Sequence, residues 1–256
     1  MKIENIDNGN AFDFGKTSAE YAKYRDIYPK ELYNKLYEIG IGKNGCSWLD
    51  IGTGTGVLPL NLYSYGADIK AIDISESQIA AAKILATEKG ADNIEFSVSL
   101  AEETPFENNS FDFITAAQCF WYFDREKIIK EIKRLLKPNG IFVKIYMSYT
   151  LDDEIAKKSH ELVKKINTSW TPGASGSKDM YNHPFENGQL DIFECKLPFT
   201  RESWHGRMLA CRGTKASMDK ETLDKWEKTH LELLSAYPEE FEINHKIYIA
   251  SYMLSK

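Results

Sequence analysis

The feature that most constrains the fold is an alternation of short apolar segments with helical segments between residues 47 and 146. Five short strands are expected, at Ser47–Ile51, Ile69–Ile72, Ile94–Val98, Phe113–Ala117 and Ile141–Tyr146. Helices are expected between them, among them Glu76–Lys89, which Gly90 closes, and one that Asp124 caps. Such alternation is typical of βαβ units, which build a parallel sheet covered by helices on both faces. We therefore expect an α/β fold.

The pattern on either side of this region is different and more helical. Residues 17–40 predict two helical pieces before the first strand. After residue 150, the sequence predicts a helix at 151–166, a loop rich in Gly, Ser and Pro at 171–177, a strand at 191–196, helices at 201–212 and 219–236, and a last strand at Phe241–Leu254. Lys137–Gly140 is expected to be a turn.

Composition excludes several classes of function. The chain of 256 residues carries 32 Lys and Arg against 38 Asp and Glu, so its net charge of −6 disfavours binding to nucleic acid. A membrane-spanning helix requires about 20 apolar residues, and no apolar run in the sequence is that long. The N-terminal residues lack the basic and apolar parts of a secretory signal, so a cytoplasmic protein is expected.

Cysteine and histidine usage gives little support for a metal site. The four cysteines form no CxxC pair, and the five histidines show no HxxxH or HExxH spacing. We therefore expect no metal ion, and free thiols in a reducing compartment.

A glycine-rich turn and an acidic residue carry the main functional signal. The run Asp50-Ile51-Gly52-Thr53-Gly54-Thr55-Gly56 follows the first strand, and Asp73 ends the second strand 21 residues after Gly52. Glycines allow a sharp turn and close approach of a ligand, and an acid at that place can accept hydrogen bonds from both ribose hydroxyls of a nucleoside. Each motif has a simpler explanation alone, as a tight turn or as a helix cap. Together they predict a nucleoside site.

Three functional readings fit a nucleoside site at these strand ends. A nicotinamide-dependent oxidoreductase is disfavoured because Val57 stands where the dinucleotide pattern GxGxxG requires its third glycine. A non-catalytic module that binds and senses the nucleoside remains open. The third reading is a methyltransferase, and it depends on the resemblance described next.

Five motifs in order resemble the class I S-adenosylmethionine-dependent methyltransferases, most closely the small-molecule branch with the ubiquinone and menaquinone methyltransferases. They are the glycine turn, AIDIS (71–75), AEETPF (101–106), FDFI (111–114) and LKPNG (136–140). YAKYR (21–25) and ESWHGR (202–207) resemble a bacterial subgroup of such enzymes. The resemblance implies a Rossmann-like, mostly parallel seven-stranded sheet with helices on both faces, an antiparallel last strand and a helical cover over the substrate.

The resemblance also implies a map of the chain as one methyltransferase domain spanning residues 1–256. In this map residues 1–44 form an N-terminal helical cover and residues 45–150 the cofactor-binding core. Residues 151–190 supply a helix and a loop, residues 198–238 a helical insert over the substrate, and residues 241–254 the final strand.

Roles for individual residues follow from the same resemblance. Asp50, Gly52, Thr53 and Gly54 would surround the methionine part of S-adenosylmethionine, and Asp73 would hold its ribose. The remaining predicted cofactor contacts are Ile74, Gln78, Ala101 and Glu102 at the adenine, Gln118 beneath the methionine, and Tyr24 and Arg25 closing over the cofactor. One departure is Leu100, because family members often carry an Asp there that reads the adenine amino group.

The substrate side is predicted from aromatic and basic residues. Trp121 and Tyr122 follow the fourth strand, where the methyl group and the acceptor would meet, and the Tyr122 hydroxyl could orient a nucleophile. On a helix at 201–212, Arg201, His205 and Arg212 would share one face, which suggests an anionic or electron-rich acceptor with His205 as a base. The expected partner is a small-molecule substrate, and the expected state is a monomer or homodimer.

Overall fold

The computed structural model describes residues 1–4, 6–172 and 174–254, and the chain divides into two compact units. The helical unit comprises Met1–Ile27, Ser148–Ala174 and Glu194–Lys246, and the sheet unit comprises Tyr28–Met147, Ser175–Phe193 and Ile247–Lys256. The range 1–44, predicted as one N-terminal helical cover, is therefore divided between the two units after Ile27. Among the described residues, no helix is long and apolar enough to span a membrane.

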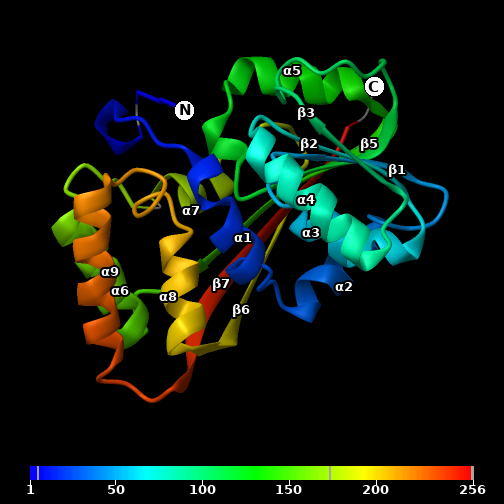
Figure 1. The fold of residues 1–256 in the computed structure, drawn as a ribbon. Coiled ribbons are helices and arrows are strands. Elements are labelled where there is room, and N and C mark those ends of the chain that lie inside the picture. Colours follow the sequence, from blue (N-terminus) through cyan, green and yellow to red (C-terminus); the bar gives the residue numbers. More distant parts are fainter. Residues whose placement is uncertain (5, 173, 255–256) are drawn as a thin grey trace. The chain divides into compact units, whose positions relative to one another are not determined.

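Seven strands form one sheet in the order β3-β2-β1-β4-β5-β7-β6 (Figure 1). Their bounds are β1 Ser47–Ile51, β2 Asp68–Asp73, β3 Ile94–Val98, β4 Phe111–Ala117, β5 Leu136–Tyr149, β6 Gln189–Thr200 and β7 Glu240–Met253. The pairs β1–β2, β1–β4, β2–β3 and β4–β5 are parallel. The carboxyl ends of these strands therefore meet at one edge of the sheet.

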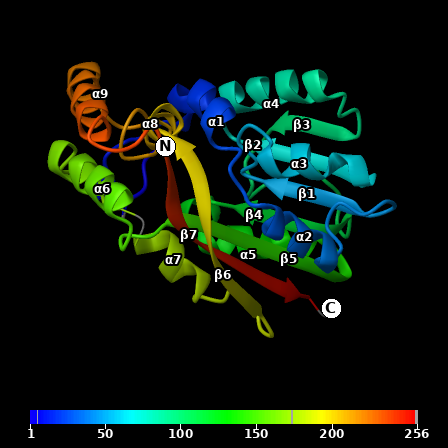
Figure 2. The same cartoon turned by 90° about the horizontal axis from the view of Figure 1, so that it is seen from below.

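The last strand runs against its neighbours, which confirms the predicted fold class. Asn139 N donates to Leu254 O, and Leu254 N donates to Gly140 O, as in an antiparallel ladder. At the other end of β5, Thr150 N donates to Asn244 O. Residue numbers thus increase along β5 while the numbers of their partners in β7 decrease, so the two strands are antiparallel. Figure 2 shows β6 and β7 pointing in opposite directions.

Helices cover both faces of the strands in the sheet unit. Ala71 of β2 packs with Ile79 and Ala82 of α4 (Glu76–Lys89) and with Leu60 of α3 (Val57–Leu62). Its neighbour Ile72, which points to the opposite face, belongs to a larger apolar core that also contains residues of α5 (Arg125–Leu135), β1, β4, β5 and β7. The strands are thus buried on both sides, which explains their nearly continuous apolar sequence.

The helical unit contains α1 (Ser18–Tyr24), α6 (Glu154–Ile166), α8 (Arg201–Leu209) and α9 (Lys220–Leu234). Within it α1 packs on α8, and α9 packs on both α6 and α8. Side chains cap three of these helices: Asp153 accepts from Ala156 N, Asp219 accepts from Thr222 N, and Thr200 forms a capping box with Ser203. Helix α2 (Lys30–Ile39) belongs to the sheet unit.

Several predicted boundaries are wrong; for example, α6 begins at Glu154 and not at residue 151, and β6 spans Gln189–Thr200 and not 191–196. Helix α8 ends at Leu209 and not near residue 212, so Arg212 lies beyond the helix. The predicted loop at 171–177 is shorter, because α7 begins at Ala174 and runs to Met180; its residue 173 lies outside the described residues. Strand β5 begins at Leu136, ahead of the expected turn, and its register with β4 shifts between Leu136 and Ile141, where Asn139 adopts a φ of 63°.

Candidate functional site

The turn after β1 requires glycine because its backbone adopts positive φ values and because neighbouring atoms leave no space for a Cβ at Gly52. Gly52, Gly54 and Gly56 have φ values of 63°, 58° and 80°, in the left-handed region that favours glycine. A Cβ at Gly52 would lie 2.7 Å from the sulfur of Cys119, so a side chain there would collide with the segment that follows β4. Thr53 N donates to Ile72 O at 2.9 Å and joins the turn to β2.

Asp73 joins the glycine turn to the start of α4. Its Oδ2 accepts from Gly54 N and its Oδ1 accepts from Ser75 N, both at 2.9 Å. The α4 cap is Ser75, so the simpler reading of Asp73 as a helix cap is wrong. Burial raises the pKa of Asp73, while these amide hydrogen bonds oppose the shift. Each carboxylate oxygen keeps a lone pair for a ligand hydroxyl.

Asp50 lies deeper in the sheet unit and is buried beside Asp73. Thr115 Oγ1 donates to Asp50 Oδ1 at 2.5 Å, and the same hydroxyl accepts from Trp48 Nε1 at 2.8 Å. The indole nitrogen only donates, so the Thr115 proton must point to Asp50. Burial raises the pKa of Asp50 to about 7, with a further contribution from the charge of Asp73. A cation bound here would favour the ionised carboxylate.

The end of β4 holds a strained residue and a buried thiol. Gln118 adopts a φ of 62° without being glycine, while its backbone N donates to Ile145 O and its Nε2 donates to Met147 O. The Cys119 sulfur contacts Ile51 O at 3.2 Å. Burial and the charges of Asp50, Asp73 and Glu102 raise the pKa of this thiol well above its usual value.

Exposed apolar side chains lie at the ends of β2 and β3. Ile74, Val98 and Leu100 are 54%, 49% and 50% exposed, and Val98 is the register partner of Asp73. Ser99 N donates to Asp73 O, which continues the pairing past the end of β3. A flat apolar group next to Asp73 would cover these side chains.

The other three residues predicted at the adenine are buried or hydrogen-bonded within the chain. Ala101 is buried, and Glu102 Oε1 accepts from Asp124 N at 2.9 Å at the start of α5. Gln78 is buried in the first turn of α4, where its backbone N donates to Ser75 Oγ.

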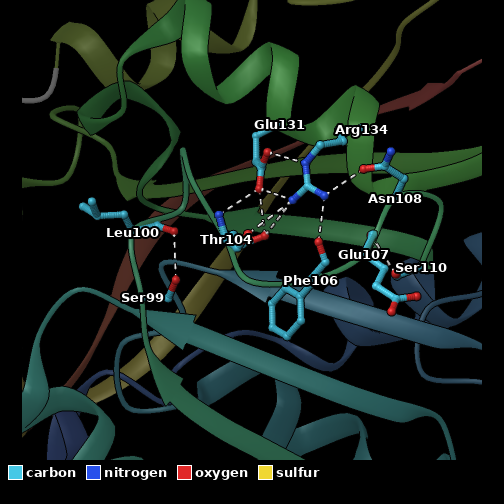
Figure 3. Close-up of polar contacts among 9 residues, drawn as sticks. All are labelled: Ser99, Leu100, Thr104, Phe106, Glu107, Asn108, Ser110, Glu131 and Arg134. Carbon is cyan, nitrogen blue, oxygen red and sulfur yellow. Dashed lines mark hydrogen bonds and ion pairs between the residues drawn. The ribbon is translucent and has the colours of Figure 1, made fainter.

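An ion pair on α5 holds the loop that follows Ala101 and Glu102. Arg134 donates to Phe106 O at 2.7 Å and to Asn108 Oδ1 at 2.9 Å, and it pairs with Glu131 at 2.7 Å. Glu131 Oε1 in turn accepts from Thr104 N and Thr104 Oγ1 (Figure 3). The sequence analysis missed this function, although the i,i+3 spacing of Glu131 and Arg134 signals a pair on one helix face.

The aromatic residues after β4 differ in their packing. Phe120 is 4% exposed and belongs to the main apolar core. Trp121 packs edge-on against Tyr146, with ring centroids 5.2 Å apart, and Tyr122 lies 5.3 Å from Trp121. The structure thus brings Trp121 and Tyr122 together on the short helix Phe120–Tyr122.

The predicted basic residues of the substrate side all belong to the helical unit, but they do not share a helix face. Arg201 starts α8 and donates Nε to Tyr237 O at 3.0 Å. Arg212, beyond the helix, forms a buried ion pair with Asp7 at 3.0 Å and donates to Thr171 O. His205 lies inside α8 and contacts His230. The expected stripe of Arg201, His205 and Arg212 is therefore wrong as a single helical face.

Tyr24 and Arg25 also belong to the helical unit, whereas the other predicted cofactor contacts belong to the sheet unit. The Tyr24 hydroxyl donates to Glu202 Oε1 at 2.9 Å, and the ring packs where a Cβ at Gly206 would stand. The Arg25 guanidinium lies 5.0 Å from the ring centre of Tyr21. Within the described ranges, no three His, Cys, Asp or Glu side chains gather as metal ligands.

The sheet order and the glycine turn with its partner Asp73 define the class I methyltransferase architecture that the sequence motifs predict. A family model described as a methyltransferase domain matches residues 42–189. The chain belongs to this methyltransferase family, which favours methyl transfer over the nicotinamide-dependent and sensor readings.

Two relatives illustrate the match in sequence. The uncharacterized methyltransferase YcgJ of Bacillus subtilis is 31% identical over 189 residues, which cover 72% of this chain and 70% of YcgJ. The ubiquinone/menaquinone biosynthesis C-methyltransferase UbiE of Rickettsia bellii is 31% identical over 163 residues, which cover 59% of this chain and 63% of UbiE.

Solved structures agree in fold. The crystal structure of YcgJ superposes with a TM-score of 0.58 at 22% identity and covers 89% of this chain and 100% of that one. A Haemonchus contortus phosphoethanolamine N-methyltransferase, in complex with phosphomonomethylethanolamine and S-adenosylhomocysteine, gives a TM-score of 0.55 at 18% identity, covering 94% and 58% of the two chains. At these identities the comparison shows the fold alone.

Proposed function

We propose that the carboxyl ends of β1 and β2 bind S-adenosylmethionine and that the protein transfers its methyl group to a small molecule. The observation that carries the proposal is Asp73, whose two oxygens hold the glycine turn and the start of α4 through Gly54 N and Ser75 N. The Asp73 oxygens then have lone pairs for a ligand, and they lie between the glycine turn and exposed apolar side chains. A nucleoside requires acceptors for its ribose hydroxyls and an apolar surface for its base.

Each part of the cofactor has candidate residues. Asp73 accepts hydrogen bonds from the ribose hydroxyls, and buried Asp50 attracts the methionine ammonium. Gly52, Thr53, Gly54 and Gln118 border the methionine, and Ile74, Gln78, Ala101 and Glu102 border the base. Because Glu102 already accepts from Asp124 N, contact with the base is mainly apolar and involves Ile74, Val98 and Leu100. Tyr24 and Arg25 remain predicted cofactor contacts.

S-adenosylmethionine supplies a methyl carbon activated by the adjacent sulfonium. The acceptor attacks this carbon in line while the electron pair of the broken C–S bond returns to sulfur, so the protein mainly orients the partners and excludes water. Trp121 and Tyr122 are proposed to contact the acceptor, with the Tyr122 hydroxyl orienting its nucleophilic atom. Aromatic faces there also favour a positive charge.

The acceptor is proposed to be a small molecule, not nucleic acid. This agrees with the net charge of −6 and with the names of UbiE and of the phosphoethanolamine enzyme, which indicate small-molecule acceptors. Arg201, His205 and Arg212 remain predicted acceptor contacts, although Arg212 is engaged with Asp7. We also infer a monomer or homodimer, and a cytoplasmic location, with which the four free cysteines are consistent.

Calorimetry tests the cofactor assignment. S-adenosylmethionine and S-adenosylhomocysteine are expected to bind, and NAD is expected to give no heat. Incubation of the protein and S-adenosylmethionine with a metabolite library should then release S-adenosylhomocysteine with one acceptor class. Binding of NAD in place of the sulfonium compound would reject the proposal, and binding without turnover across the library would favour a sensor.

A further inference from the structure

The loop between β3 and β4 depends on α5 for the partners of its backbone. The described residues 99–110 form neither helix nor strand, so their backbone polar groups need partners from other parts of the chain. Glu131 Oε1 accepts from Thr104 N at 2.8 Å. Arg134 donates to Thr104 O at 3.3 Å and to Phe106 O at 2.7 Å (Figure 3). Two side chains of α5 thus hold both backbone groups of Thr104 and the carbonyl of Phe106.

The guanidinium of Arg134 is used at each of its nitrogen atoms. Nε and Nη2 donate to the two carboxylate oxygens of Glu131 at 2.8 Å and 2.7 Å, and Nη1 donates to Phe106 O and to Asn108 Oδ1. A lysine ammonium has a single nitrogen atom, so it could not reach all of these groups at once. The fixed geometry of the guanidinium therefore helps to determine the path of the loop.

Glu131 is ionised in this arrangement. Burial alone would raise the pKa of its carboxyl, but hydrogen bonds from Arg134 and Thr104 hold the pKa below its usual value. Hydrogen bonds that involve a charged group are stronger than those between neutral groups. At neutral pH the loop is thus held by an ion pair and by charge-assisted hydrogen bonds.

The first residues of the loop are held as well. Ser99 N donates to Asp73 O at 3.0 Å, and Glu102 Oε1 accepts from Asp124 N at the start of α5. Residues 100 and 101 are Leu and Ala, whose side chains have no hydrogen-bonding group. Recognition of a base at residues 100–102 therefore depends on the position of the main chain and of the apolar side chains, which the contacts with α5 determine.

We propose that Glu131 and Arg134 are positioning residues that hold residues 100–102 in their adenine-binding arrangement before the cofactor binds. The inference rests on the proposed function, because it takes the base to lie against residues 100–102. Both side chains act through the main chain of the loop and not by contact with the cofactor. A surface that is already ordered need not be ordered by the ligand, so the base binds to it more tightly.

Amide hydrogen exchange of the ligand-free protein shows whether the pair orders the loop. The Thr104 amide, which donates to Glu131, should be protected in the wild type. Glu131→Ala and Arg134→Lys should speed exchange in residues 99–108 about tenfold, and Glu131→Gln, which keeps an oxygen for the Thr104 amide, should lie nearer to wild type. The control is Lys127→Ala, which removes the exposed Lys127–Asp124 pair at the same i,i+3 spacing on α5 and should leave the loop unchanged.

A comparison of two ligands shows whether the ordered loop serves the base. S-ribosylhomocysteine has the ribose and homocysteine parts of S-adenosylhomocysteine but lacks the base, and NMR titration measures both affinities. Glu131→Ala should bind S-adenosylhomocysteine about tenfold more weakly, which corresponds to the ordering of about one residue of backbone. Its affinity for S-ribosylhomocysteine should change less than about twofold. Thermal melts show whether the variant is folded, and Arg134→Lys, expected to lose about threefold for S-adenosylhomocysteine alone, provides the same test if Glu131→Ala does not fold.

Three results would overturn the proposal. They are a Thr104 amide that exchanges equally fast in wild type and Glu131→Ala, an unchanged affinity of the variants for S-adenosylhomocysteine, and equal losses for the two ligands. Equal losses would mean that the pair supports the site as a whole and not the base. If the cofactor assignment itself is wrong, the wild type binds neither ligand, whereas failure of the positioning role alone leaves wild-type binding intact.

Discussion

Two aspartates, Asp73 in the sheet unit and Asp7 in the helical unit, have different kinds of hydrogen-bond partners. In the sheet unit, Asp73 is partly buried and accepts main-chain hydrogen bonds from Gly54, 19 positions away, and from Ser75. In the helical unit, Asp7 is 2% exposed and accepts from Thr171, 164 positions away, while pairing with Arg212. Asp73 is the proposed contact for a ligand, whereas the carboxylate of Asp7 joins distant segments of the fold.

The comparison separates two uses of buried polarity. At the sheet edge, backbone amides support the charged group, so side chains can serve a ligand. Among the helices, the buried carboxylate of Asp7 pairs with Arg212 and accepts from Thr171, so its charge maintains the fold. The experiments below test this distinction from the largest expected effect to the smallest.

Arg212→Ala should produce the largest loss of stability. It leaves the buried Asp7 carboxylate without its counter-ion, which typically costs about 3–5 kcal/mol of unfolding free energy. The matched control is Glu194→Ala, which removes the exposed Lys246–Glu194 pair and should change stability by less than about 1 kcal/mol. Urea unfolding measures the unfolding free energy of both variants. Equal losses of stability would show that the buried Arg212–Asp7 pair stabilises the helical unit no more than the exposed pair does.

Asp73→Ala should weaken binding of S-adenosylmethionine about 100-fold, since two charge-assisted hydrogen bonds to the ribose would be lost. Asp68→Ala, at the exposed start of the same strand β2, should leave the affinity unchanged. Calorimetry gives the two affinities, and thermal melts show whether each variant is folded. An Asp73→Ala protein that is folded and binds normally would remove the carboxylate from the proposed site.

Asp50→Asn should alter the pH dependence of stability. The folded-state pKa of Asp50, about 7, exceeds its ordinary value, so the folded protein holds the proton more tightly than the unfolded chain does. The unfolding free energy of the wild type therefore decreases as pH rises from about 4 to above 7. The Asn side chain does not ionise, so Asp50→Asn lacks this decrease, and its amide oxygen still accepts from Thr115. We expect an advantage for Asp50→Asn on the order of 2 kcal/mol at pH 8 and almost none at pH 4.

Unfolding curves of ligand-free protein across this pH range measure the effect. Asp68→Asn, at an exposed carboxylate, is the control and should follow the wild type at every pH. Parallel curves for wild type and Asp50→Asn would mean that Asp50 is not held in its protonated form.

Leu100→Asp should have the smallest effect, a change in selectivity. In the wild type, apolar contact with the base should distinguish S-adenosylhomocysteine from S-inosylhomocysteine by less than about tenfold. A carboxylate at position 100 would accept from the adenine amino group and oppose the inosine oxygen, raising this ratio about tenfold. Leu151→Asp, equally exposed in the helical unit, should leave the ratio unaltered. An unchanged ratio for Leu100→Asp would place the base elsewhere.

The sheet unit was largely predictable because its signals are local. The predicted bounds of Ser47–Ile51, Glu76–Lys89 and Ile94–Val98 are confirmed without change. Each has short-range signals at its ends, such as the Ser75 cap and Gly90 after α4. Asp73 was found in the same way, because its place at a strand end follows from the sequence alone.

What the sequence analysis missed depends on contacts between distant segments. Nothing local marks Thr115 as the partner of Asp50, 65 positions away, or Ser159 as the partner of His230, 71 positions away. The early end of α8 reflects Thr214, whose hydroxyl donates to the carbonyls of Met208 and Leu209 and so ends the helix before Arg212.

The thiol of Cys119 has a consequence for an enzyme that holds an electrophile. A thiolate is a strong nucleophile, and one beside Gly52 would compete with the acceptor for any alkyl group delivered there. Burial and three surrounding carboxylates keep this sulfur in its unreactive thiol form at neutral pH. The same negative surroundings that attract a cationic donor thus protect the protein from methylating itself.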